Sequence, residues 1–188
     1  ALSSAASDVY KRQLYGWETN MMIGYHAVPV IVDAYLKGIG NFDSEKALEA
    51  CIATANRDDY RGIGDYKKLG YVPAYGDPKK WENWSLSKTL EYAYDDWCLG
   101  QMARILGKDE DYQVFDQRSE NWMNLFDPQT GFIRPKDSEG HWIEPFDPYH
   151  TPGFTEGNAF NYSWFVPHNP CKLIQLVGQE RFVERLNR

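Results

Sequence analysis

The sequence predicts a mainly helical protein with a small two-stranded insertion. Segments whose apolar residues recur at helical spacing follow one another in pairs, joined by loops of very unequal length. The chain has no alternation of strand and helix patterns and no GxGxxG motif, which disfavours a nucleotide-binding α/β fold. Paired helices with long loops suit an α/α toroid, and the pattern alone does not separate this fold from an ordinary helical bundle.

Caps mark the boundaries of several predicted helices. Asp43 or Ser44 provides an N-cap for the second helix, and Ser85 or Ser87 provides one for the third. Gly107 follows the third helix at the position where a left-handed residue usually ends a helix. The predicted helical segments cover residues 21–37, 42–56, 87–107, 109–126, 161–178 and 179–188.

Three connecting regions complete the expected fold. Residues 57–84 are rich in Gly, Tyr, Asp and Pro and predict a long loop, of a kind that often carries function. Residues 131–135 and 140–146 predict two short strands that pair in a small ribbon. Residues 147–159 predict an irregular polar loop.

Composition excludes several classes of function. The net charge is −7 and no basic cluster occurs, which disfavours a nucleic-acid partner. No apolar run is long enough to span a membrane. Aromatic residues make up 15% of the chain, which fits either a well-filled core or stacking against the apolar faces of sugars. The three cysteines lie far apart without a CxxC pair, so a zinc site is not expected.

The segment TLEYAYDD concentrates three acids near the start of a predicted helix. Glu91 and Asp95 are four residues apart and therefore share one helix face. A negative neighbour and partial burial raise the pKa of a carboxyl group, which is one way to obtain a general acid at neutral pH. Acids in the first turn of a helix also simply favour the helix dipole, so the pattern allows both interpretations.

A second polar segment, FTEGNAFNY, combines Glu156 with Asn158. Amide and carboxylate oxygens are ligands that calcium accepts, although a helix-cap turn explains the same residues. His26 lies at the start of a predicted helix, where a cation is disfavoured, which allows a neutral hydrogen-bonding role or, more commonly, that of a satisfied core histidine. His168 allows the same role or that of a core histidine, and no HxH or HExxH spacing supports a histidine metal centre.

The order of these segments resembles glycoside hydrolase family 92. The resemblance covers nearly all of residues 17–188 and is carried by IGYHAVPVIVDAYLKGI, SLSKTLEYAYDDWCLGQMARILGK, NLFDPQTGFIRPK, PFDP and FTEGNAFNYSWFVPH. It implies that residues 14–188 are part of an (α/α)₆ toroid, the catalytic domain of a calcium-dependent, inverting exo-α-mannosidase. Members are mostly bacterial and exported, which implies a periplasmic, extracellular or cell-surface location and mannose-containing glycans, such as N-glycans, as substrates.

The resemblance also implies roles for individual residues. Glu91 matches the catalytic acid, and Thr155 and Glu156 match the pair beside the leaving-group sugar. Asn158 matches part of the Ca²⁺ shell, and His26 falls in a matching segment near the substrate. Members that prefer α-1,2 linkages carry His where this chain has Thr155, which leaves the linkage open.

Two further observations concern the expected activity and the start of the chain. The family's general base lies in a Gly-Asn-Asp-Asp-type motif that this chain lacks, so the chain alone is expected to be inactive. Residues 1–13 share no pattern with the rest, show no apolar signal segment and are expected to be a non-native or disordered leader. A non-catalytic α/α carbohydrate-binding or structural module, and a glycosidase of another α/α family, are the alternatives.

Overall fold

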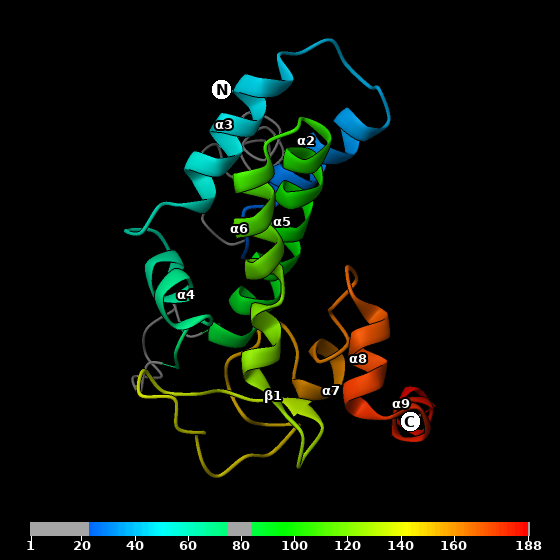
Figure 1. Cartoon of the computed structure of the whole chain (residues 1–188). Coiled ribbons are helices and arrows are strands. Elements are labelled where there is room, and N and C mark those ends of the chain that lie inside the picture. Colours follow the sequence, from blue (N-terminus) through cyan, green and yellow to red (C-terminus); the bar gives the residue numbers. More distant parts are fainter. Residues whose placement is uncertain (1–22, 75–83, 188) are drawn as a thin grey trace. The chain divides into compact units, whose positions relative to one another are not determined.

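The computed structural model describes residues 23–74 and 84–187, so the leader predicted at residues 1–13 lies outside the described part. The described residues form mainly helices with one small antiparallel sheet (Figure 1). They belong to two compact units. The first comprises residues 23–64 together with Glu91–Glu120, and the second comprises residues 65–74, 84–90 and 121–187.

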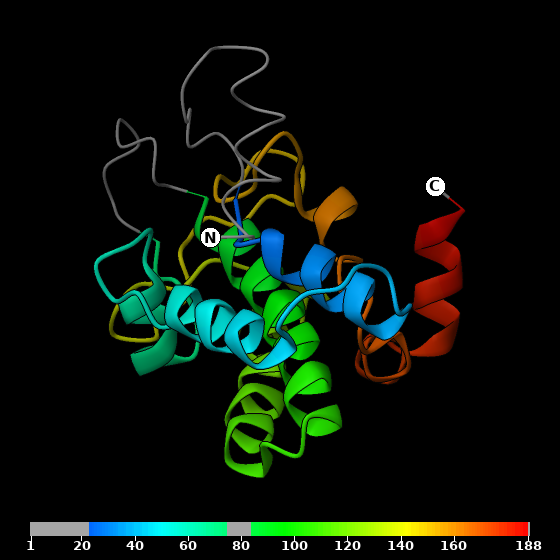
Figure 2. The ribbon, with the colours of Figure 1, turned by 90° about the horizontal axis from the view of Figure 1, so that it is seen from above.

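The first unit is a helical layer. It contains α2 (Ala27–Leu36), α3 (Ser44–Ala55), α6 (Asp109–Ser119) and most of α5 (Ser85–Ile105). Helices α2 and α3 lie side by side (Figure 2). Apolar side chains from these helices form a dry core that includes Val28, Val32, Leu48, Cys51, Leu99, Met102 and Phe115.

Arg118 ties three helices of this unit together. From α6, its Nε donates to Asp96 Oδ2 in α5 at 2.8 Å, and its Nη2 donates to the Ala55 carbonyl at the end of α3 at 3.0 Å. Asp43 caps α3 as predicted, because its side chain accepts the Lys46 N–H. These contacts satisfy polar groups at the helix ends and fix α5 within the unit.

The second unit mixes short helices with the sheet. Strands β1 (Phe126–Asp127) and β2 (Phe132–Ile133) pair in antiparallel register, with Phe126 opposite Ile133. The remaining elements are α4 (Ile63–Leu69, in this unit from Asp65), the first turn of α5, the 3₁₀ helix η1 (Asn121–Leu125), α7 (Ala159–Tyr162), α8 (Pro170–Val177) and α9 (Gln179–Leu186).

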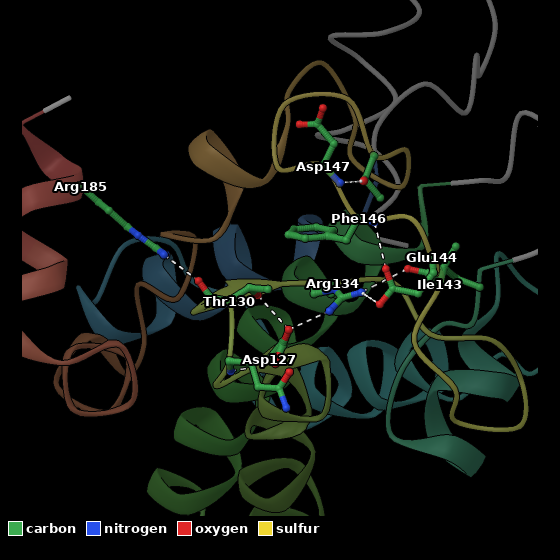
Figure 3. Close-up of polar contacts among 10 residues, drawn as sticks. Asp127, Thr130, Arg134, Ile143, Glu144, Phe146, Asp147 and Arg185 are labelled. Carbon is green, nitrogen blue, oxygen red and sulfur yellow. Dashed lines mark hydrogen bonds and ion pairs between the residues drawn. The ribbon is translucent and has the colours of Figure 1, made fainter.

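Arg134, directly after β2, organises the polar interior of the second unit (Figure 3). Its Nη1 donates to Asp127 Oδ2 at 2.8 Å, and its Nη2 donates to Glu144 Oε1 at 2.6 Å. The guanidinium also lies over the Phe146 ring, 4.6 Å from the centroid. The side chain of Arg134 is 6% exposed, so this fork is a buried charge network that holds the loop after β2.

The structure corrects three sequence-based predictions about the elements. The sheet pairs residues 126–127 with residues 132–133, whereas the predicted second strand, residues 140–146, forms only a single bridge between Trp142 and Lys136. The tight turn after Asp127, closed by its side chain on the Gln129 N–H, favours the nearer partner. The predicted loop 57–84 contains helix α4, and the predicted helix 161–178 is divided into α7 and α8.

The start of α5 is capped by a distant carbonyl, which corrects the prediction that Ser85 or Ser87 caps it. The Gly153 carbonyl accepts the N–H groups of Leu86 and Ser87 at 3.0 and 3.2 Å. Gly153 has φ +120°, and a Cβ atom there would lie 3.0 Å from Leu86 Cγ. Only glycine allows this approach, because it tolerates the backbone angle and leaves room for the leucine.

Replacing Gly153 by Ala should therefore destabilise the chain. Gly178 is the matched control, because it also has a positive φ but nothing lies within 4 Å of its Cβ position. We expect G153A to cost about 1–3 kcal/mol more than G178A, since only the former forces repacking against Leu86. Urea unfolding of both variants measures the difference, and equal midpoint shifts would show that the close approach does not matter.

Candidate active site

Glu91 lies in the second turn of α5, because the helix begins at Ser85. The first turn contains no acid, so the helix-dipole interpretation of the TLEYAYDD segment does not apply to this chain. The side chain of Glu91 is 8% exposed. A carboxyl group this buried needs polar partners, and the structure supplies one from a distant segment.

His26 lies between Glu91 and Asp95. Its Nε2 is 2.9 Å from Glu91 Oε2, and its Nδ1 is 2.8 Å from Asp95 Oδ1. The two carboxyl groups share one face of α5 as predicted, and the imidazole separates them. The histidine thereby compensates the repulsion that two like charges at this spacing would otherwise cause.

The backbone before α2 holds this arrangement in place. The Tyr25 N–H donates to Asp95 Oδ2 at 2.7 Å, so Asp95 binds both the backbone and the imidazole of the same segment. Gly24 has φ +77°, and a Cβ atom there would lie 2.6 Å from the His26 ring. Asp95 is fully buried, and its carboxylate holds both the backbone of Tyr25 and the ring of His26 in place.

The electrostatics favour a positively charged imidazole. Burial disfavours the cation, but the hydrogen bonds to Asp95 and Glu91 and the charges of these two groups outweigh it and raise the pKa of His26 to about 10. Burial raises the pKa of Asp95, and the hydrogen bonds from His26 and from the Tyr25 N–H act against this rise. The prediction of a neutral His26 is therefore wrong, because two carboxyl groups 69 and 65 residues away in sequence dominate over the helix dipole.

This pKa gives a pH dependence of stability with a defined sign. The folded-state pKa of His26, about 10, lies above its ordinary value of 6.5, so the folded state binds more protons between these values. The stabilisation from His26 is complete below pH 6.5 and is lost as the pH rises towards 10. Thermal unfolding from pH 6 to 10 should show a steeper decline for the unmodified chain than for His26→Gln. Parallel curves would contradict the assignment.

Asp96 has a structural role that differs from that of its neighbours. Its Oδ1 accepts the Tyr25 hydroxyl, and its Oδ2 accepts Arg118 Nε. Asp96 is completely buried and belongs to the network that joins α3, α5 and α6. The three acids of TLEYAYDD are therefore divided between helix anchoring and a Glu91–His26–Asp95 cluster.

The remaining predicted site residues lie together in the second unit. The Thr155 N–H donates to Ser87 Oγ at 3.0 Å, and Thr155 Oγ1 is buried without a hydrogen-bond partner among the described residues. Glu156 is exposed and adopts φ +53°, a left-handed conformation that is unusual for a residue with a side chain. Such orphaned hydroxyls and strained backbones are often found at ligand sites.

Asn158 acts as a helix cap in this chain. Its Oδ1 accepts the N–H groups of Phe160 and Asn161 at 3.0 and 3.2 Å, at the start of α7. These bonds use the amide oxygen that a calcium ion would need. No group of three or more His, Cys, Asp or Glu residues in the described ranges could hold a metal. Ca²⁺ binding through Asn158 therefore stays a prediction.

Sequence patterns identified most of the cluster but not its connections. The helical spacing of Glu91 and Asp95 indicated a shared face, and the segment containing His26 was singled out for a different reason. No sequence signal showed that His26 joins the two acids, because the contact is long-range. The orphaned hydroxyl of Thr155 and the Gly153 cap likewise depend on packing that the sequence does not display.

Comparisons with known proteins identify a family for this chain. The profile of the glycosyl hydrolase family 92 catalytic domain matches residues 8–188. A curated protein of Arthroderma benhamiae, described as an uncharacterized secreted glycosidase, is 32% identical, and the match covers 96% of this chain and 29% of that protein. The match to the profile covers nearly the whole chain and all the site residues named above.

Solved structures show the same similarity. A family GH92 α-mannosidase from Bacteroides thetaiotaomicron is 43% identical with a TM-score of 0.85, over 92% of this chain and 23% of that chain. The same enzyme in complex with mannoimidazole is 42% identical with a TM-score of 0.84, over the same shares. An inverting family GH92 mannosidase of that bacterium is 36% identical with a TM-score of 0.81, over 97% of this chain and 26% of that chain.

The chain therefore spans between 23% and 29% of the length of these relatives. Its mainly helical structure with a small antiparallel sheet confirms the predicted fold class, part of an (α/α)₆ toroid with a small ribbon. Every helix in the described residues is too short or too polar to cross a membrane. On the profile match and the structural likeness together, this chain belongs to glycoside hydrolase family 92 and forms part of its catalytic domain.

Proposed function

We propose that the enzyme containing this segment removes terminal α-linked mannose from glycans, with Glu91 as the acid that protonates the leaving oxygen. One observation carries the proposal. The buried carboxyl group of Glu91, in helix α5 of a family 92 catalytic domain, has its Oε2 atom 2.9 Å from Nε2 of His26. Solved relatives described as α-mannosidases, one of them in complex with mannoimidazole, support mannosides as the substrate class.

The proposed chemistry is a single displacement at the anomeric carbon. Glu91 gives its proton to the glycosidic oxygen while a water molecule attacks from the opposite face of the ring. A second carboxylate must activate this water, at a separation of about 6.5–9.5 Å from the acid. The chain contains no Gly-Asn-Asp-Asp-type segment, so we propose that the base comes from another part of the enzyme and that the chain alone is inactive.

Thr155 and Glu156 are proposed to bind the leaving-group sugar. The buried Thr155 hydroxyl lacks a partner among the described residues, and a sugar hydroxyl would satisfy it. Glu156 is exposed, so its carboxylate can accept hydrogen bonds from a ligand. We also propose that the enzyme is exported, depends on Ca²⁺ and inverts the configuration at the anomeric carbon.

The test uses a polypeptide that includes the complete family 92 catalytic domain. We expect it to release mannose from α-1,2-, α-1,3- or α-1,6-linked mannobiose, with β-mannose as the first product detected by ¹H NMR. α-Mannose as the first product would contradict inversion, and sugar binding without turnover would favour a carbohydrate-binding module. Loss of activity in EDTA, restored by Ca²⁺, tests the calcium requirement, and unchanged activity after chelation would refute it.

A further inference from the structure

The proposed reaction gives no task to His26, which lies in the cluster around Glu91. His26 contacts the carboxyl group of Glu91 with one ring nitrogen and that of Asp95 with the other, at 2.9 and 2.8 Å. Its side chain is 33% exposed, whereas that of Asp95 is fully buried. A histidine that only filled space in the core would not need two carboxyl groups at hydrogen-bond distance.

The orientation of the imidazole is determined by the protein. Asp95 accepts both His26 Nδ1 and the Tyr25 N–H, so the ring and the backbone preceding it are fixed to the same carboxylate. Gly24 provides the close approach, since any larger residue would collide with the ring. Because Nδ1 is held, Nε2 points at Glu91 Oε2 with a defined direction.

We propose that His26 is a positioning residue for Glu91. His26 fixes the orientation of the Glu91 carboxyl group and stabilises the carboxylate that remains after Glu91 has given up its proton. The inference rests on the proposed function and deepens it. A protonated imidazole donates its Nε2–H to Glu91 Oε2 throughout the reaction. The donor is already oriented before charge develops, which is the condition for an electrostatic contribution to catalysis.

The proton and electron balance is simple. The O–H bond of Glu91 breaks and its proton goes to the glycosidic oxygen, which keeps the electron pair of the C1–O bond as that bond breaks. The attacking water forms the new C1–O bond and gives a proton to the second carboxylate. The electron pair of the O–H bond stays on Glu91 as a carboxylate, and solvent returns a proton after the product leaves. His26 keeps both its protons during this cycle, since Oε2 accepts its N–H and the other oxygen of Glu91 carries the transferred proton.

Asp95 makes the charged form of His26 compatible with burial. The charged or titratable side chains that face the imidazole are Glu91 and Asp95, both from α5. Burial lowers the pKa of His26, but the hydrogen bonds and charges of Asp95 and Glu91 outweigh it and raise this pKa to about 10, so the ring is an imidazolium at neutral pH. Removing Asp95 would leave this cation only one partner.

The test compares two substrates that differ in their need for an acid. We expect His26→Ala to lower kcat on an unactivated α-mannoside by about 10²-fold, as for loss of one oriented donor, and His26→Gln to lower it less. On 2,4-dinitrophenyl α-mannoside, whose leaving group needs no proton, both variants should stay within about threefold of the unmodified enzyme, because general acid catalysis contributes little there. His141→Gln is the matched control, because His141 pairs with Asp137 on the surface at 71% exposure.

A second measurement does not depend on activity. Nitrogen-15 NMR of the imidazole in this chain should show His26 protonated on both nitrogens at pH 8, and Asp95→Asn should lower the pH at which it titrates. A neutral His26 at pH 8 would overturn the proposal even if the His26→Ala variant failed to fold.

The outcomes separate the two proposals. If the unmodified enzyme hydrolyses neither mannoside, the proposed function fails, while the NMR titration still reports on His26. If the enzyme is active and His26→Ala loses equal activity on both substrates, or none on either, the positioning role alone is wrong. A selective loss on the unactivated substrate, together with an imidazolium at pH 8, supports it.

Discussion

Replacing Glu91 by Gln should abolish most turnover of unactivated α-mannosides by an enzyme that carries this segment within a complete catalytic domain. We expect kcat to fall by about 10²–10⁴-fold, the usual contribution of a positioned general acid. Gln has nearly the size of Glu, and its amide oxygen can still accept His26 Nε2–H, so the cluster should persist. The variant lacks only the proton that the leaving oxygen needs.

The comparison needs a matched change elsewhere. Glu139→Gln makes the same chemical substitution at a side chain that is 78% exposed. It should leave kcat within about twofold of the value for the unmodified enzyme. Dinitrophenyl α-mannoside should restore much of the rate of Glu91→Gln, since that leaving group departs without protonation. Retained activity on unactivated substrates would refute the role of Glu91 directly.

Removing the Arg134 side chain should cause the largest loss of stability. We expect Arg134→Met to cost about 3–5 kcal/mol, because it leaves Asp127 buried without its cation. Asp127 is 4% exposed, and although burial opposes its ionisation, hydrogen bonds from Arg134, the Gln129 N–H and Thr130 hold its pKa below the ordinary value (Figure 3). Urea unfolding measures the loss through the transition midpoint at constant slope.

The two acidic partners of Arg134 provide an internal control. Glu144 is 66% exposed, so Glu144→Gln should cost no more than about 1 kcal/mol despite its 2.6 Å contact. Asp127→Asn combined with Arg134→Met should be less destabilising than Arg134→Met alone, because it removes the uncompensated charge. Equal effects of Arg134→Met and Glu144→Gln would show that burial does not set the strength of this network.

Local patterns predicted the helices well, because helix formation depends on residues close in sequence. The predicted helix over residues 87–107 corresponds to α5, Asp43 caps α3, and Gly107 has φ +69° after the end of α5. Cys51 and Cys98 are buried and form no disulfide. The errors arose where distant contacts decide, as in the Gly153 cap of α5 and the partner of strand β2.

The site shows the same division between local and distant information. Helical spacing placed Glu91 and Asp95 on one face, and it correctly implied that their charges need compensation. The compensating group, His26, is 65 residues away from Glu91 in sequence, and its local position suggested a neutral ring. Only the folded chain shows that two carboxyl groups surround it and keep it charged.

The roles of Glu91, Asp95 and Asp96 follow from burial and partner rather than from residue type. Asp96 binds Arg118 and Tyr25 and stabilises the helices, whereas Asp95 binds His26 and the backbone. Glu91 also contacts His26, whose side chain is 33% exposed. The structure therefore separates Asp96, which anchors helices, from the Glu91–His26–Asp95 cluster, for which we propose positioning and catalytic roles.

A crystal structure of the complete catalytic domain with mannoimidazole tests the central assignment most directly. This inhibitor carries a ring nitrogen at the place of the glycosidic oxygen, and a catalytic acid approaches it within about 2.6–3.2 Å. We predict that the Glu91 carboxyl makes this contact while its Oε2 stays bonded to His26. A different acid at that nitrogen, with Glu91 turned away from the inhibitor, would contradict the account.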